Sequence, residues 1–231
     1  SFATGNGVIS VFGDVKAAVV KAQVEKAFAK LPRGNRQIAL GREYHASAKP
    51  AAWTEHLDKE QAVIVVGFRT VGLEDRDVHA LNLIDEACSD MGSRLFNRIR
   101  EELGLAYYVG AQNFAAMGAG AFYFYVGTDP KKVKLAEKEL MAQINDLAAN
   151  GLHTEEIDRA RVTWRSSWLR AQQGNTGMAD VCAWNEINGL GWDHFQKLPG
   201  IMDDISSKEI QRVAAKYFGE KNAFIVRVLP K

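Results

Sequence analysis

Residues 103–128 read LGLAYYVGAQNFAAMGAGAFYFYVGT and contain no charged residue. A membrane-spanning helix needs about 20 mostly apolar residues, so this stretch is long enough to be one. It contains Gln112, Asn113 and five glycines, however, and residues 122–126 are aromatic and β-branched, which favours a strand. The stretch therefore predicts two strands around a turn at residues 116–120, and no membrane span.

The segments before this hairpin alternate between strand and helix patterns. Residues 61–70 (QAVIVVGFRT) are nearly all apolar in the middle, which predicts a strand buried on both faces. Apolar residues at helical spacing then predict a helix over residues 74–89 and a shorter one over 93–102. The chain thus places two helices between its first buried strand and the hairpin.

The segments after the hairpin carry clear helix boundaries. Thr128-Asp129-Pro130 predicts a helix start, with a capping Asp and a Pro at the first helical position, and Asn150-Gly151 predicts the end. Ser206 and Glu209 form a capping box for a last helix, and residues 223–229 predict a closing strand. Helices interleaved with strands and a hairpin predict an α+β fold: a two-layer domain with helices packed on one face of a mixed sheet.

The first 50 residues differ from the rest in charge. The 231-residue chain has a net charge of +1, but residues 1–50 carry +5 and residues 51–231 carry −4. Residues 8–12 predict a strand and 15–30 a helix, and residues 6–14 repeat the pattern of residues 222–230. We interpret residues 1–34 as the tail of a preceding similar domain, 35–50 as a linker, and 51–231 as a nearly complete domain. A chance likeness between two short strands is the alternative.

The composition excludes several classes of protein. With 47% apolar and 25% charged residues, the chain is neither disordered nor of low complexity. The near-zero net charge argues against nucleic acid as a partner. Two distant cysteines predict buried thiols and do not identify the compartment.

The common catalytic motifs are missing from the sequence. None of the five histidines has a His or Cys partner at metal-binding spacing, and no HExxH, HxxEH, CxxC, P-loop or GxSxG motif occurs. The residues therefore predict no metal site in this chain.

The segment from Met91 to Val109, MGSRLFNRIREELGLAYYV, is the most informative. It resembles a hallmark run of the pitrilysin (insulinase) family of zinc metallopeptidases, and the chain is also similar to mitochondrial processing peptidase subunits. The VFGD at 11–14 with a helix ending at Leu31-Pro32, the GTDP at 127–130 and the final strand ending at Pro230 extend the resemblance over most of the chain.

The resemblance implies repeated α+β domains, paired into halves that close around a peptide. Catalytic domains of the family carry HxxEH plus a distant Glu, with zinc bound by two His and one Glu. In this chain the corresponding helix has His79, but Asn82 and Leu83 replace the Glu and the second His. It therefore resembles the C-terminal inactive, substrate-binding domain. Zinc is expected only in the catalytic partner domain, on the same polypeptide or a separate subunit, and the chain alone is predicted to be inactive.

Inactive domains of the family supply an Arg and a Tyr to the partner's active site, and Arg100 and Tyr107 match that pair. An Arg can donate two hydrogen bonds to a peptide carbonyl, and a Tyr hydroxyl can donate to the oxyanion of a tetrahedral intermediate. Arg98 and Tyr108 are the alternative pair, because a register shift of one or two residues exchanges them. Arg100 could also be an ordinary surface charge, and Tyr107 a core aromatic.

The sequence therefore predicts a non-catalytic domain of a zinc metalloendopeptidase that helps to bind peptide substrate and lends Arg100 and Tyr107 to the zinc site of its partner. The alternative is a purely structural domain of the same superfamily, like the core subunits of respiratory complexes.

Overall fold

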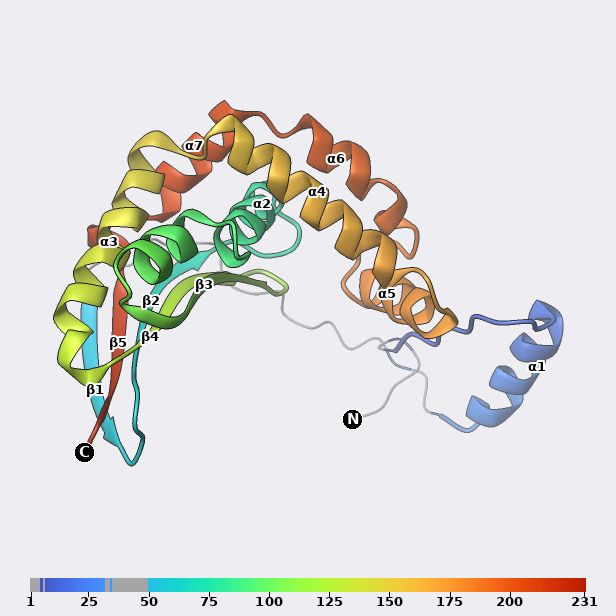
Figure 1. Ribbon diagram of the computed structural model, residues 1–231. Coiled ribbons are helices and arrows are strands. Elements are labelled where there is room, and N and C mark those ends of the chain that lie inside the picture. Colours follow the sequence, from blue (N-terminus) through green and yellow to red (C-terminus); the bar gives the residue numbers. More distant parts are fainter. Residues whose placement is uncertain (1–4, 6, 32–33, 35–49) are drawn as a thin grey trace. The chain divides into compact units, whose positions relative to one another are not determined.

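The computed structural model describes residues 5, 7–31, 34 and 50–231 (Figure 1). These residues form two compact units. The sheet unit comprises the described residues of Gly41–Trp164 and Ile201–Lys231, and the helical unit comprises those of Ser1–Leu40 and Arg165–Gly200. The predicted linker at residues 35–50 lies, apart from its last residue, outside the described part of the chain.

The sheet unit is built on one five-stranded sheet with the order β1-β5-β2-β4-β3. The strands are β1 (Ala51–Leu57), β2 (Ala62–Thr70), β3 (Ala106–Ala115), β4 (Gly120–Thr128) and β5 (Phe224–Pro230). Only β1 and β5 pair in parallel, so the sheet is mixed, as predicted. The uncharged stretch forms the antiparallel hairpin β3–β4, and none of the described helices is long and apolar enough to cross a membrane.

Helices cover one face of this sheet, which confirms the predicted two-layer architecture (Figure 1). They are α2 (Asp77–Ser89), α3 (Val133–Asn150) and α7 (Ser207–Tyr217). The short helices η2 (Pro130–Lys132) and η4 (Glu220–Asn222) precede α3 and β5. Both predicted caps form: the Asp129 side chain accepts from Lys131 N, and that of Ser206 accepts from Glu209 N.

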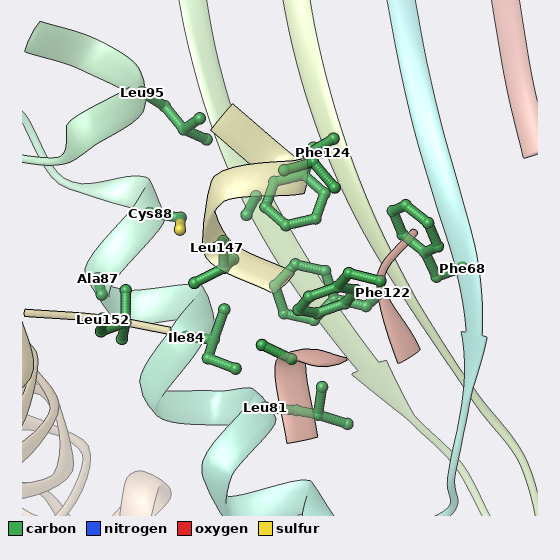
Figure 2. Packing of buried hydrophobic residues seen from close by; sticks show 14 of the residues in the cluster. Phe68, Leu81, Ile84, Ala87, Cys88, Leu95, Phe122, Phe124, Leu147 and Leu152 are labelled. Carbon is green, nitrogen blue, oxygen red and sulfur yellow. The ribbon is translucent and has the colours of Figure 1, made fainter. Parts of the chain in front are cut away.

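The core between sheet and helices is aromatic at its centre (Figure 2). Phe122 and Phe124 of β4 are fully buried, with ring centroids 4.9 Å apart. The ring of Phe218, just after α7, lies 4.8 Å from that of Phe122. Such pairs add about 0.5–1.5 kcal/mol each beyond the burial of their area.

Along β2 every second residue from Ala62 to Thr70 is buried against the helices, whereas Val63, Val65 and Gly67 are half-buried and Arg69 is exposed. The prediction that this strand is buried on both faces is therefore wrong, because α2, α3 and α7 cover one face only (Figure 1).

A buried carboxylate joins α2 to α7. Asp77 accepts hydrogen bonds from the Arg212 guanidinium, from Lys216 Nζ at 2.8 Å and from Tyr217 Oη at 2.9 Å. Burial by itself would raise the pKa of Asp77, but these three donors outweigh it and hold the pKa well below its usual value. The carboxylate is therefore charged at neutral pH and ties the two helices together.

The helical unit contains α1 (Ala17–Phe28), α5 (Asn175–Ile187), η3 (His194–Gln196) and parts of α4 (Thr154–Ala171) and α6 (Leu198–Asp204). The prediction of a strand at residues 8–12 is wrong: these residues form no strand. A strand needs a partner, and residues 8–12 have none among the described residues. The helix predicted after them forms as α1, but none of its residues is buried.

Candidate functional site

The helix that carries Arg100 is a π-helix, η1 (Phe96–Glu102). A regular α-helix was expected here, but Leu103 N–H donates to the Arg98 carbonyl, five residues back. Such π-helical turns often occur at functional sites. Leu95 and Ile99 are buried and anchor the helix to the core, which leaves the positions on its other side exposed.

Arg100 and Arg98 differ in how firmly their side chains are held. The Arg98 guanidinium bonds Glu102 at 2.7 Å and contacts Glu139 of α3 at 3.6 Å. The Arg100 guanidinium carbon lies 4.8 Å from the ring centre of Phe96, and its nearest carboxylate, that of Glu101, is 3.9 Å away. The Arg100 guanidinium thus has weaker ion-pair contacts than that of Arg98, and it stacks on the ring of Phe96.

A tight turn connects this helix to β3. Gly104 has φ +56°, a conformation that glycine adopts without steric cost. Thr128 Oγ1 donates to the Leu105 carbonyl at 2.6 Å, and Lys132 Nζ donates to the Gly104 carbonyl at 3.1 Å. With Leu105 buried as well, the backbone between Arg100 and Tyr107 is held in place at Gly104 and Leu105.

Tyr107 is the extra residue of a β-bulge. In the β3–β4 register, Ala106 pairs with Thr128 and Tyr108 pairs with Gly127, which leaves Tyr107 without a partner on β4. Its side chain is 53% exposed and borders a small cavity of 80 Å³ that Asp129 and Lys132 also line. Bulges recur next to active sites, where they redirect a side chain.

Tyr108 has a different environment. Its ring lies over Gly127, where an added Cβ would come within 2.3 Å of the ring, and its centroid is 6.2 Å from that of Tyr125. Tyr108 therefore packs on the sheet face away from the helices, and Tyr107 projects from the bulge. The strand pattern predicted that only one of Tyr107 and Tyr108 can reach the same face of the sheet. The bulge was not predicted, because no residue type in this segment indicates it.

Helix α2, at the expected place of a zinc motif, does not offer the ligands. Leu83 is fully buried, and Asn82 Oδ1 accepts from Asn113 Nδ2 at 2.8 Å. One turn further, Asp85 accepts from Asn113 N at 2.9 Å, and burial raises the pKa of its carboxyl. Within residues 5, 7–31, 34 and 50–231, no three His, Cys, Asp or Glu side chains gather as a metal site.

Comparison with known proteins identifies the family. The family described as peptidase M16 inactive domain matches residues 2–163. The chain belongs to this family. The family resemblance expected from residues 91–109 is thereby confirmed.

The similar proteins agree with this assignment. The chain is 32% identical over 171 residues to an uncharacterized zinc protease of Rickettsia felis, covering 73% of this chain and 40% of the relative. It is 30% identical to an uncharacterized zinc protease of Streptomyces coelicolor, covering 95% of this chain and 49% of the relative. The chain thus spans half or less of the length of these relatives.

Solved structures show the same fold. The peptidase M16 inactive domain from Pseudomonas fluorescens superposes with a TM-score of 0.83 at 18% identity, covering 95% of this chain and 52% of that one. The inactive peptidase domain of a putative zinc protease from Bordetella parapertussis gives 0.67 at 18% identity and covers 77% and 96%. The predicted fold class is therefore confirmed.

Proposed function

We propose that this chain is the non-catalytic, peptide-binding half of a zinc metalloendopeptidase, and that Arg100 and Tyr107 reach the zinc site of its catalytic half. The membership in the inactive-domain family and the zinc proteases among its relatives support this assignment. Zinc is bound by the catalytic half, because the residues at the motif position here, Asn82 and Leu83, do not fit a zinc site.

The observation that carries the proposal is the contrast between the two Arg–Tyr pairs. Arg98 is held by two carboxylates, and Tyr108 packs flat on the sheet. The Arg100 side chain is as exposed as that of Arg98 but has only a 3.9 Å contact to Glu101, and the Tyr107 side chain is exposed at the bulge. Side chains whose polar groups are accessible, on a backbone that is held in place, suit the recognition of a second chain.

The two side chains then have separate tasks. Arg100 donates two parallel hydrogen bonds to carbonyl oxygens of the bound peptide and fixes its register. The Tyr107 hydroxyl donates a hydrogen bond to the oxygen that gains negative charge as the scissile carbonyl becomes tetrahedral. Zinc in the catalytic half supplies the activated water.

The test is an exchange of Arg for Lys in the assembly of this chain with its catalytic half. Arg100→Lys keeps the charge but loses the planar pair of donors, so kcat/KM should fall about tenfold. Arg98→Lys is the matched control and should leave kcat/KM within about twofold. Equal effects of the two substitutions, or no effect of Arg100→Lys, would remove Arg100 from the site. Activity of the assembly also separates this function from a purely structural role.

A further inference from the structure

The helical unit contains a pocket of 680 Å³ that has no part in the proposed function. Residues of α4, α5, η3 and α6 line it, together with Val8, which precedes α1. All of the lining residues belong to the helical unit, whereas Arg100 and Tyr107 belong to the sheet unit. The pocket is therefore a separate feature, and its volume lies in the range of about 300–1,000 Å³ that is typical of ligand sites.

The lining of this pocket is mostly apolar and rich in aromatic rings. Its largest side chains are those of Trp168, Trp184 and Phe195. The Trp184 side chain is 59% exposed, so its ring is accessible to a ligand. Aromatic side chains bury a large area and pack well against another flat ring, in offset or edge-to-face arrangements. The lining therefore favours a flat, apolar molecule.

Asn185 of α5 adds a polar group that lacks a partner. The residue is 7% exposed, and its Nδ2 is buried without a hydrogen-bond partner among the described residues. Neighbouring donors are already bonded: Trp168 Nε1 donates to the Phe195 carbonyl at 3.1 Å, and Gln172 Nε2 donates to the Trp168 carbonyl at 2.8 Å. Because a buried amide N–H without an acceptor costs free energy, Asn185 has a donor to offer to a ligand.

The charges of the lining select against an ionic ligand. Among the described residues, the lining includes the carboxylate of the exposed Asp180 and no Lys, Arg or His. An anion would have to leave water without a cation to receive it, and a cation offers no acceptor to the Asn185 N–H. The last torsion of an asparagine side chain is broad, so the Asn185 amide can turn its N–H toward a neutral oxygen in the pocket.

We propose that this pocket binds a neutral, flat, apolar molecule that carries a carbonyl oxygen. The rings of Trp168, Trp184 and Phe195 contact its apolar body, and its carbonyl oxygen accepts from Asn185 Nδ2. The ligand thus supplies the acceptor that the described part of the chain does not. The proposal does not depend on the role of Arg100 and Tyr107.

The test compares probes of nearly the same shape in chemical-shift titrations of the purified chain, residues 1–231. They are acetophenone, α-methylstyrene, which has a methylene group in place of the oxygen, and benzoate, which is an anion. Acetophenone should bind about fivefold more tightly than α-methylstyrene, because only its oxygen accepts the Asn185 hydrogen bond. Benzoate should bind about tenfold more weakly than acetophenone.

Three variants locate the binding. Asn185→Leu removes the amide, so it should bring the ratio of the two neutral probes close to one without lowering the midpoint of urea unfolding. Asn175→Leu, at the exposed first residue of α5, is the matched control and should keep the fivefold ratio. Ala183→Phe fills the pocket and should weaken the binding of both neutral probes about tenfold.

Several results would overturn the proposal. Equal binding of acetophenone and α-methylstyrene by the wild type would show that water already satisfies the Asn185 amide. A ratio that Asn185→Leu leaves at fivefold, or binding that Ala183→Phe does not weaken, would place the probes elsewhere. A marked drop in the unfolding midpoint of Asn185→Leu would show that the amide is bonded within the protein. Sedimentation as a dimer that Ala183→Phe dissociates would assign the pocket to a second copy of the chain.

Discussion

On the helix-covered face of the sheet, Phe68, Phe122 and Phe124 are at most 1% exposed, whereas on the open face Tyr108 is 41% exposed and Tyr123 and Tyr125 are half-buried. The two faces use aromatic rings differently. Phenylalanine has no polar atom and gains most from complete burial, whereas the tyrosine hydroxyl tolerates water while the ring covers the strand below. The covered face therefore contributes most of the stability of the sheet unit, and the open face contributes less.

The largest effect is expected on the covered face. Phe122→Ala should lower the free energy of unfolding by about 4 kcal/mol, because it removes a fully buried ring that packs against Phe124 and Phe218. Urea unfolding followed by circular dichroism measures this change. A loss below about 1 kcal/mol would show that the aromatic centre is not the main source of stability.

A smaller and pH-dependent effect is expected at Asp77. Asp77→Asn should lower the free energy of unfolding by about 2 kcal/mol at pH 7, since Asp77 is buried but Arg212 and Lys216 are partly exposed to water. The pKa of Asp77 is lower in the folded protein than the value of about 3.9 in the unfolded chain. The contribution is therefore present above about pH 4 and is lost as the pH falls further.

Unfolding of both proteins at pH 7 and pH 3 measures this difference. The gap between wild type and Asp77→Asn should narrow at pH 3, because the Asp77 carboxyl of the unfolded chain takes up a proton there while that of the folded protein stays charged. A gap that stays constant or widens toward low pH would contradict the assignment of the carboxylate as the link between α2 and α7.

The smallest effect is expected on the open face. Tyr123→Ala should cost less than about 1 kcal/mol of unfolding free energy, because its ring is only half-buried and its ring neighbour Tyr125 is half-buried as well. A cost close to that of Phe122→Ala, measured in the same urea titration, would remove the distinction between the two faces.

Much of this fold could be predicted from local patterns, and what could not depends on pairing. The hairpin, the Asp129 and Ser206 caps and the position of strand β2 follow from residue types at short spacing, but the burial of β2 on one face only does not. Strand β1 was missed because its seven residues are all exposed and show no alternation. The place of β5 between β1 and β2 is set by contacts between distant segments, which no local pattern records.

The candidate site shows the same division. The motif around residues 91–109 led to Arg100 and Tyr107, but two features that distinguish them from Arg98 and Tyr108 leave no signal in the sequence. One is the π-helical geometry of η1, and the other is the bulge at Tyr107. Each feature shifts the position of the following side chains by about one residue. A shift of this size is what left the choice between Arg100 with Tyr107 and Arg98 with Tyr108 open in the sequence.

The most direct measurement of the central claim is kcat of the assembly of this chain with its catalytic half, for Tyr107→Phe beside Tyr123→Phe. Each substitution removes one tyrosine hydroxyl and keeps the ring. Tyr107→Phe should lower kcat about 10- to 100-fold with an unchanged free energy of unfolding, and Tyr123→Phe should leave kcat unchanged. An unchanged kcat for Tyr107→Phe, or an equal loss in both variants, would contradict a role for Tyr107 in the partner's active site.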